Sequence, residues 1–330
     1  MKIKLNTTST TPSATYVHHL ADLLRKHASQ HEYIVDDEQI DNIDIYHSLI
    51  SNISHYSLLW GDARSVLTVP DLNFLRYPQL FSLFDRLVRI RRYKYACRAA
   101  DCVITLNRKA KDELAEKLHI DEQKIRVLLS LAAQPPLERE DQVSHEMIRR
   151  KYMISDDYVL MMGVLESRHN QLAVIEAMVE LQSNITLVIC GRHTAHADFL
   201  LDCVRAARAT SRVNFIYEPA PIDLPALFRM ARGFVYLPDA DAEASVLPVI
   251  EALRAEVPMI LSDIPIHREA AADAAMYVAP QEVDCLVSAL ESLLGDAKLR
   301  CDLIMRERVR AELFSERTVA QRLVDIYSSL

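Results

Sequence analysis

Two glutamates stand eight residues apart in the segment 241–252, which reads D-A-E-A-S-V-L-P-V-I-E-A. Pro248 suits the first turn of a helix that begins near Leu247. The start of such a helix presents N–H groups and the positive end of the helix dipole, which together favour a phosphate. Glu251 would lie about one turn inside the helix and Glu243 just before it. Both glutamates could therefore face a ligand held at the helix start.

Taken alone, this spacing also has a plain structural explanation. Glu251 could be an ordinary helix glutamate favoured by the dipole, and Glu243 could be a solvated loop residue. The surrounding sequence favours a positioned pair of glutamates, because apolar stretches at 233–237 and 258–261 predict a strand on each side of the segment. The pair would then be positioned by a strand–loop–helix–strand unit.

The same alternation of strands and helices runs through the chain twice over, which predicts an α/β protein with two doubly wound parallel sheets. The predicted strands are 2–5, 41–46, 64–69, 102–106 and 124–129, then 158–162, 185–190, 213–217, 233–237, 258–261 and 276–279. Pro135 and Pro136 lie in the best candidate for a linker. We therefore expect one domain at 1–135, a second at 136–312, and a C-terminal helix in 313–330 that crosses back to the first domain.

Composition narrows the class of protein. The chain has 330 residues, half of them apolar, which is enough for two medium-sized cores. Its net charge of −8 argues against a nucleic-acid partner. There is no apolar run of about 18 residues and no apolar signal segment at the start, so we expect a cytoplasmic protein. Six cysteines without a C-x-x-C pair predict packed, reduced thiols and no metal site.

Glycine is unusually scarce in this sequence. Five glycines occur where an average usage of about 7% would give roughly 23. Nucleotide-binding α/β proteins use glycine to bring the backbone close to phosphate. This chain therefore has few glycines that could bring the backbone close to a phosphate.

The segment 243–269, E-A-S-V-L-P-V-I-E-A-L-R-A-E-V-P-M-I-L-S-D-I-P-I-H-R-E, resembles the donor-binding segment of retaining glycosyltransferases of family 4. That resemblance implies a GT-B fold, with two Rossmann-like domains facing a cleft, and a nucleotide-sugar donor without a bound metal. It implies that Glu251 holds the ribose and that Glu243 lies by the donor sugar and phosphates. The helix start at Val246 and Leu247 would stabilise the departing diphosphate, with Ser245 as an extra donor.

A second match to the family lies in the loop 163–170, G-V-L-E-S-R-H-N, where the family reads close to G-R-L-x-x-R-K-N. Gly163 and Arg168 match. The two cationic positions that usually hold the diphosphate are Val164 and His169 here. Each charge-assisted contact contributes about 1.5–3 kcal/mol. A protonated His169 would recover part of one contact.

Other departures from the family pattern lead to competing hypotheses. The family's histidine is Pro70, its G-F-G is 244–246, and its glycine before V-P is Glu256. The first hypothesis is a metal-independent retaining glycosyltransferase of polysaccharide or glycoconjugate biosynthesis, acting on a glycan or lipid-linked acceptor. The second is a catalytically inactive relative that serves as a partner or scaffold subunit. The base of the donor, UDP or GDP in type, the sugar, the acceptor and the oligomeric state are not predicted.

A third hypothesis is an α/β enzyme of another class, such as an epimerase on the same fold. Such an enzyme needs its own acid and base. His193, Asp263 and His267 are nominal candidates for them.

The predicted helix 83–100 carries six cations: Arg86, Arg89, Arg91, Arg92, Lys94 and Arg98. One interpretation is peripheral contact with an anionic membrane that carries a lipid-linked acceptor, on its cytoplasmic face, at roughly 1 kcal/mol per well-placed cation. The other is a solvated helix face whose arginine stems cover the core. The sequence alone does not separate them.

Overall fold

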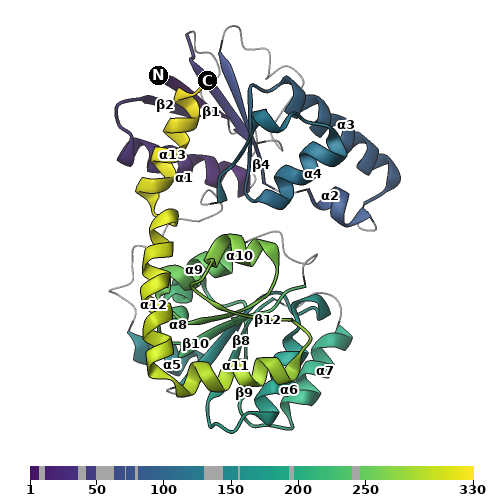
Figure 1. Cartoon of the computed structure of the whole chain (residues 1–330), viewed down its shortest axis with the longest axis vertical. Helices are drawn as coiled ribbons and strands as arrows, with labels where there is room; N and C mark the ends of the chain where they lie inside the picture. The colour runs from purple at the N-terminus through teal and green to yellow at the C-terminus, as the bar shows by residue number, and fades with distance from the viewer. Residues whose placement is uncertain are drawn as a thin grey trace. The chain divides into compact units, whose positions relative to one another are not determined.

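The computed structural model describes residues 1–6, 12–35, 42–49, 63–70, 72–78, 81–129, 144–154, 157–192, 197–239 and 246–330. The chain divides into two compact units, Met1–Pro135 with Leu313–Leu330, and Pro136–Glu312. Each unit contains a six-stranded sheet flanked by helices (Figure 1). All described strand pairs are parallel, which confirms the predicted fold class of two doubly wound parallel sheets.

The first unit has the strand order β2-β1-β3-β4-β5-β6. Its elements are β1 (Lys2–Asn6), α1 (Pro12–His27), β2 (Glu32–Val35), β3 (Ile45–Leu49), β4 (Arg64–Val69), α2 (Asn73–Arg76), α3 (Leu83–Ala99), β5 (Cys102–Thr105), α4 (Arg108–Leu118), η3 (Glu122–Lys124), β6 (Ile125–Val127), η8 (Glu312–Phe314, at the boundary) and α13 (Glu316–Ser328). Successive strand side chains point to opposite faces of the sheet. Val66 therefore packs with α1 and α13, whereas Leu67 packs with α2, α3 and α4.

The second unit has the strand order β12-β11-β10-β7-β8-β9. Its elements are α5 (His145–Tyr152), β7 (Tyr158–Met162), η6 (Ser167–His169), α6 (Gln171–Glu180), β8 (Thr186–Gly191), α7 (Ala197–Ala207), β9 (Val213–Tyr217), η7 (Pro221–Asp223), α8 (Leu224–Arg229), β10 (Gly233–Tyr236), α9 (Leu247–Ala255), β11 (Met259–Ser262), α10 (Pro265–Ala271), β12 (Met276–Val278), α11 (Val283–Gly295) and α12 (Ala297–Ala311). Val159, Val235 and Ile260 bury one face of the sheet with α6 and α11.

Among the α-helices and strands, β2, α2 and α7 were not predicted from the sequence, and one strand was misplaced. The short helices η3, η6, η7 and η8 were not predicted either. The strand predicted at 41–46 is wrong, because β3 begins only at Ile45. Asn42 has a left-handed backbone with φ of 64°, which no strand residue adopts. The side chain of Asp44 accepts a hydrogen bond from the backbone N–H of Lys2 at 2.7 Å.

Helix α13 is part of the first unit although it is the last helix of the chain. It packs beside α1 (Figure 1). At its start, Glu316 accepts from Lys26 Nζ at 2.9 Å and lies 3.0 Å from His27 Nε2. At its end, the Tyr327 hydroxyl lies 2.7 Å from Nδ1 of His47, a buried residue of β3. The sheet and the C-terminal helix therefore share one core.

The contact between His47 and Tyr327 gives a first prediction. The other ring nitrogen of His47 lies 2.7 Å from Thr68 Oγ1, and burial lowers the His47 pKa to about 4. Tyr327→Phe removes the hydroxyl and leaves the buried Nδ1 of His47 without its hydrogen-bond partner. We expect the free energy of unfolding to fall by about 1–3 kcal/mol in denaturant titration. Tyr95→Phe, at an exposed residue of α3, is the control, and an equal effect of the two changes would contradict the prediction.

No helix in the part of the chain that the structure describes is long and apolar enough to cross a bilayer.

Candidate functional site

The strand order of the second unit marks a specific place on its sheet. β7 comes first in the sequence of this sheet; β8 and β9 follow on one side of it and β10 to β12 on the other. Ligands of open α/β sheets bind at the carboxyl ends of the strands where the order reverses in this way. Here that place is the end of β7 and β10. The loops that leave these two strands are those that contain the predicted site residues.

The loop after β7 begins with a close approach between two backbone segments. Gly163 has a φ of +141°, which residues with a side chain rarely adopt. Its N–H donates to the Cys190 carbonyl at 3.1 Å. A methyl group on Gly191 would lie 1.8 Å from the Gly163 carbonyl oxygen. The glycine-poor chain therefore keeps two of its five glycines where the ends of β7 and β8 meet.

The two loops at this edge are tied together by Asn170. This residue has a left-handed backbone and begins α6. Its side-chain amide donates to the Leu237 carbonyl at 2.8 Å and to Asp239 Oδ1 at 2.9 Å. The N–H of Asp239 donates in return to the Arg168 carbonyl at 2.9 Å. The end of β10 is thus held by the β7 loop, an arrangement that the sequence reasoning missed although asparagine tolerates this backbone well.

Helix α9 begins at this edge. Val246 is buried at its N-cap position, Pro248 lies in its first turn, and no described side chain caps its start. Glu251 lies about one turn inside the helix, as predicted, and is partly exposed. Its Oε1 lies 3.1 Å from Arg254 Nη1. Burial raises the pKa of Glu251, and the charge of Arg254 opposes that shift.

The cationic character of the β7 loop is weak. Val164 supplies no charge. Arg168 is paired with Glu166 through its Nε. His169 is buried, and burial together with the charge of Arg168 lowers its pKa. The ring is therefore neutral at pH 7, and the protonated His169 that would recover part of a diphosphate contact is not favoured. Its Nδ1 has no hydrogen-bond partner among the described residues.

Several predicted residues cannot be placed. Glu243 and Ser245 lie outside the described residues, and so does His193. Within the part of the chain that is described, no group of three or more His, Cys, Asp or Glu side chains is arranged to hold a metal ion.

Glu256, which replaces a family glycine, lies at the far end of α9 from the candidate site. It ends the helix with a left-handed backbone, φ 55°, and pairs with Arg308 at 2.7 Å. A nine-residue helix is about 13 Å long. The absence of a glycine at this position is therefore no sign of relaxed phosphate binding. Glu218 likewise has a positive φ, of 48°.

The described residues of the epimerase hypothesis have structural partners. His267 is fully buried, its Nδ1 lies 3.1 Å from both Ser262 Oγ and the Ser262 carbonyl, and burial lowers its pKa to about 4. Asp263 forms a two-point ion pair with Arg268, which also stacks on the ring of Tyr277. These contacts account for Asp263 and for Nδ1 of His267, whereas Nε2 of His267 is buried without a hydrogen-bond partner among the described residues.

Arg76, in the first unit, is structural as well. Its Nη2 lies 2.8 Å from Glu113 Oε2, and both side chains are buried. The ion pair fixes the short helix α2 against α4.

The protein has two doubly wound units with parallel sheets, and the candidate ligand site lies at the carboxyl ends of the strands in the second unit. This architecture is that of a GT-B protein. The sequence model of the family described as "Glycosyl transferases group 1" matches residues 145–310, half of the chain and nearly all of the second unit. The chain belongs to this family of glycosyltransferases.

Two curated relatives of this chain are also glycosyltransferases by name. The O-antigen chain mannosyltransferase RfbU of Salmonella typhimurium is 26% identical over 233 residues, which cover 70% of this chain and 61% of the relative. The O-antigen chain mannosyltransferase B of Escherichia coli is 25% identical over 188 residues, or 56% of this chain and 49% of the relative. The chain therefore spans about half to three fifths of the length of these relatives.

Solved structures share the whole fold at low sequence identity. Anabaena Alr3699/HepE in complex with UDP has a TM-score of 0.72 and 15% identity, with 100% of both chains covered. WaaG, a glycosyltransferase involved in lipopolysaccharide biosynthesis, has a TM-score of 0.62 and 16% identity over 99% of this chain and all of its own. These likenesses establish the fold.

Proposed function

We propose that the protein transfers a sugar from a nucleotide-sugar donor to a glycan or lipid-linked acceptor in polysaccharide biosynthesis. Membership of the glycosyl transferases group 1 family supports sugar transfer. The names of the two relatives support mannose as the sugar and an O-antigen-like polysaccharide as the product. The neighbour solved with UDP supports a nucleotide-activated donor.

One observation carries this proposal. The loop after β7 and the start of α9, which follows β10, both belong to the switch point of the second sheet, with Glu251 one turn inside the helix. A helix start stabilises a diphosphate through its backbone N–H groups and dipole. A carboxylate at the depth of Glu251 can accept hydrogen bonds from the hydroxyls of a ribose. Val246, Leu247, Gly163, Arg168 and His169 would surround the donor, and Glu243 and Ser245 would orient the sugar.

Catalysis in this proposal is electrostatic and needs no metal. The helix start would stabilise the charge that develops on the departing diphosphate. Retention of the anomeric configuration, as in the family that the sequence resembles, would be read from the product by NMR. The acceptor side is assigned to the first unit, in a protein that works in the cytoplasm at the inner face of a membrane.

Glu251 provides the direct test of the donor site. We expect Glu251→Gln to weaken nucleotide binding by about 10- to 100-fold, because a charge-assisted hydrogen bond is lost. Calorimetric titration of the purified protein with UDP, GDP and ADP, and then with their sugars, measures the change. The nucleotide that binds tightest identifies the base for acceptor screens.

Glu256→Gln is the matched control, because it changes the same residue type at the C-cap of α9, away from the helix start. It should leave nucleotide affinity unchanged. Equal affinity of Glu251→Gln and the parent would refute the ribose role.

A specific observation favours a second candidate, a non-catalytic partner or scaffold subunit. The β7 loop has only one cation, Arg168, and Glu166 neutralises it in part. If no nucleotide binds at millimolar concentration to a well-folded sample, this second function replaces the first. The next search would then be for a protein partner.

A further inference from the structure

The second sheet ends at a strand that lacks the usual protection against pairing with other strands. The terminal strands of the two described sheets are β2, β6, β9 and β12. Natural edge strands carry charges or stay short, which keeps other strands away from them. β2 contains Glu32, β6 contains Arg126, and β12 has three residues, with Arg268 stacked on the ring of its Tyr277. β9, with the sequence V-N-F-I-Y, has five residues and neither a charge nor a proline.

The backbone of β9 directs hydrogen-bonding groups away from the sheet. On the inner side of the strand, the N–H of Leu187 in β8 donates to the Arg212 carbonyl at 2.7 Å. Because parallel strands bond through every second residue, Val213, Phe215 and Tyr217 point their N–H and C=O groups outward. On that outward side, neither Val213 nor Phe215 bonds to a residue that the structure describes. A row of such groups is a template for another strand.

Exposed apolar side chains surround this edge. Tyr217 at the end of β9 is 46% exposed, Met153 after α5 is 85% exposed, and Leu201 of α7 is 49% exposed. The side chain of Asn214 in β9 donates to the Met153 carbonyl at 3.2 Å, which places Met153 beside the strand. On the opposite face of the sheet, Phe215 packs in the core that α7 shares. An interface at β9 would therefore remove apolar surface from water and also satisfy the backbone.

We propose that β9 pairs in antiparallel orientation with β9 of a second copy of the chain, so that the second units of the two copies share one continuous sheet. A two-fold axis beside Phe215 relates the copies, and Phe215 then lies opposite its own equivalent. The N–H and C=O groups of this central pair exchange hydrogen bonds. The same register places Val213 opposite Tyr217 of the copy and Arg212 opposite Glu218 of the copy.

The charges at the two ends of β9 favour this register. Arg212 precedes the strand, and its guanidinium donates to the Thr210 hydroxyl and to main-chain carbonyls such as that of Ser183. Glu218 follows the strand and is exposed. Neither Arg212 nor Glu218 forms an ion pair with a residue in the described part of the chain. Antiparallel pairing brings the cation of one copy toward the anion of the other at both ends of the interface, whereas parallel pairing would bring like charges together.

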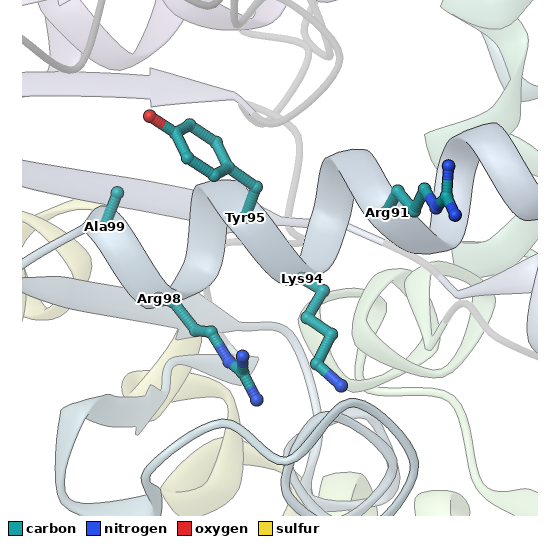
Figure 2. Close-up of a pocket in the computed structure, with 5 residues that line it drawn as sticks. All are labelled: Arg91, Lys94, Tyr95, Arg98 and Ala99. Atoms are coloured by element: carbon teal, nitrogen blue, oxygen red, sulfur yellow. The ribbon is translucent and has the colours of Figure 1, made fainter.

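Charge also favours β9 over the other exposed apolar surface, at the start of α3, as the site for a second copy. Leu83 and Phe84 are exposed there, but the following turns of α3 are cationic. Figure 2 shows Lys94 and Arg98 extending to the same side of this helix. A two-fold interface places the same surface of both copies together, so it would bring these cations against their equivalents and cost free energy. The uncharged strand β9 meets no such repulsion.

This pairing goes beyond the proposed sugar transfer and does not depend on it. The candidate donor site lies at the ends of β7 and β10, and β8 separates β7 from β9. Neither strand of the candidate site takes part in the new interface. Self-association and nucleotide binding can therefore be tested, and can fail, separately.

The test is sedimentation velocity of the full chain at concentrations from about 1 to 100 µM, a range that covers the affinity of a small interface. We expect the parent to change from monomer to dimer within this range. Val213→Lys with Tyr217→Lys puts a lysine opposite a lysine of the copy at both outer pairs. This variant should weaken the dimer about tenfold or more.

A charge-swapped variant tests the register itself. Val213→Glu with Tyr217→Lys puts a glutamate opposite a lysine of the copy in the proposed antiparallel register. It should dimerise about tenfold more tightly than the variant with two lysines. Tyr217→Pro provides a further variant should Val213→Lys fail to fold, because position 217 is exposed and proline removes an N–H that points away from β8. It should also weaken the dimer about tenfold or more.

Met305→Lys with Val309→Lys is the matched control, because it adds the same two charges at exposed apolar positions of α12. It should dimerise like the parent, and thermal melts should show which variants are folded. A parent that stays monomeric at the highest concentration overturns the proposal. So does a dimer that the folded β9 variants leave unchanged. A charge-swapped variant no tighter than the one with two lysines overturns the antiparallel register.

Discussion

Replacing Gly191 with alanine is expected to lower the free energy of unfolding of the second unit by about 3 kcal/mol or more, at or beyond the upper end for overpacked sites. The added methyl group would lie 1.8 Å from the oxygen and 2.9 Å from the carbon of the Gly163 carbonyl. Both are backbone atoms of the residue that follows β7, which pairs with β8. No side-chain rotation relieves the clash, so the two strands must separate.

Gly295→Ala is the control for this change. Gly295 ends α11, and a methyl group built there has no neighbour within 4 Å. Alanine at the end of a helix is expected to be neutral or to stabilise by up to about 1 kcal/mol. Denaturant titration of the two variants and the parent measures the difference. Similar midpoints for Gly191→Ala and Gly295→Ala would contradict the close approach of the two strands.

The second large effect is expected from the pH dependence of stability and involves Glu307 of α12. Its side chain is fully buried, and neither carboxyl oxygen has a hydrogen-bond partner among the described residues. Burial, reinforced by the nearby charge of Glu256, raises the pKa of Glu307 from 4.5 to about 9. The native protein therefore keeps this proton at neutral pH, whereas the unfolded chain loses it.

The sign of the effect follows from proton binding. Between the unfolded pKa of 4.5 and the native pKa of about 9, the native state binds one more proton than the unfolded state. Stability therefore falls as pH rises through this window, with a slope approaching about 1.4 kcal/mol per pH unit. Glu307→Gln has nearly the same shape and cannot ionise. We expect it to flatten the decline and to be more stable than the parent at alkaline pH by a few kcal/mol.

Denaturant titrations at a series of pH values from neutral to about 9 test this expectation. Glu291→Gln changes an exposed glutamate of α11 and should follow the parent curve. The buried His47 and His267 affect the free energy of unfolding at acidic pH instead. Because their native pKa values are lowered to about 4, they remove stability as pH falls from 6.5 toward that value. An alkaline slope that persists in Glu307→Gln would show that another group causes it.

The fold was predictable because the strands of both sheets are apolar, short and regularly spaced. The stretches 64–69, 158–162 and 213–217 were placed to the residue. Short β2 was missed because four residues with mixed polarity carry too weak a pattern. The strand before His47 was misplaced because Asn42 and Asp44 are used for turn and hydrogen-bond contacts that only the three-dimensional structure shows.

The candidate site was predictable in position but only partly in chemistry. The sequence placed Glu251 about one turn inside α9, where the structure has it. It could not show that His169 is buried and neutral, because burial depends on packing around the β7 loop. The sequence also could not show which of the replaced family glycines lie near the candidate site and which lie away from it. Glu256 and Glu218 simply adopt a positive φ, as do Asn42, His119, Met153, Asn170 and Ala272.

The packing of α13 against α1 has a consequence for how the protein is made. The ribosome synthesises residues 1–135 first, and domains generally fold in the order of synthesis. Here the first unit lacks α13 until the whole second unit has been translated, since Val319, Leu323 and Tyr327 fill part of its core. The unit that is made first is therefore completed last. A nascent chain that stalls before α13 would leave the apolar face of α1 and β3 uncovered, as an exposed site for chaperones.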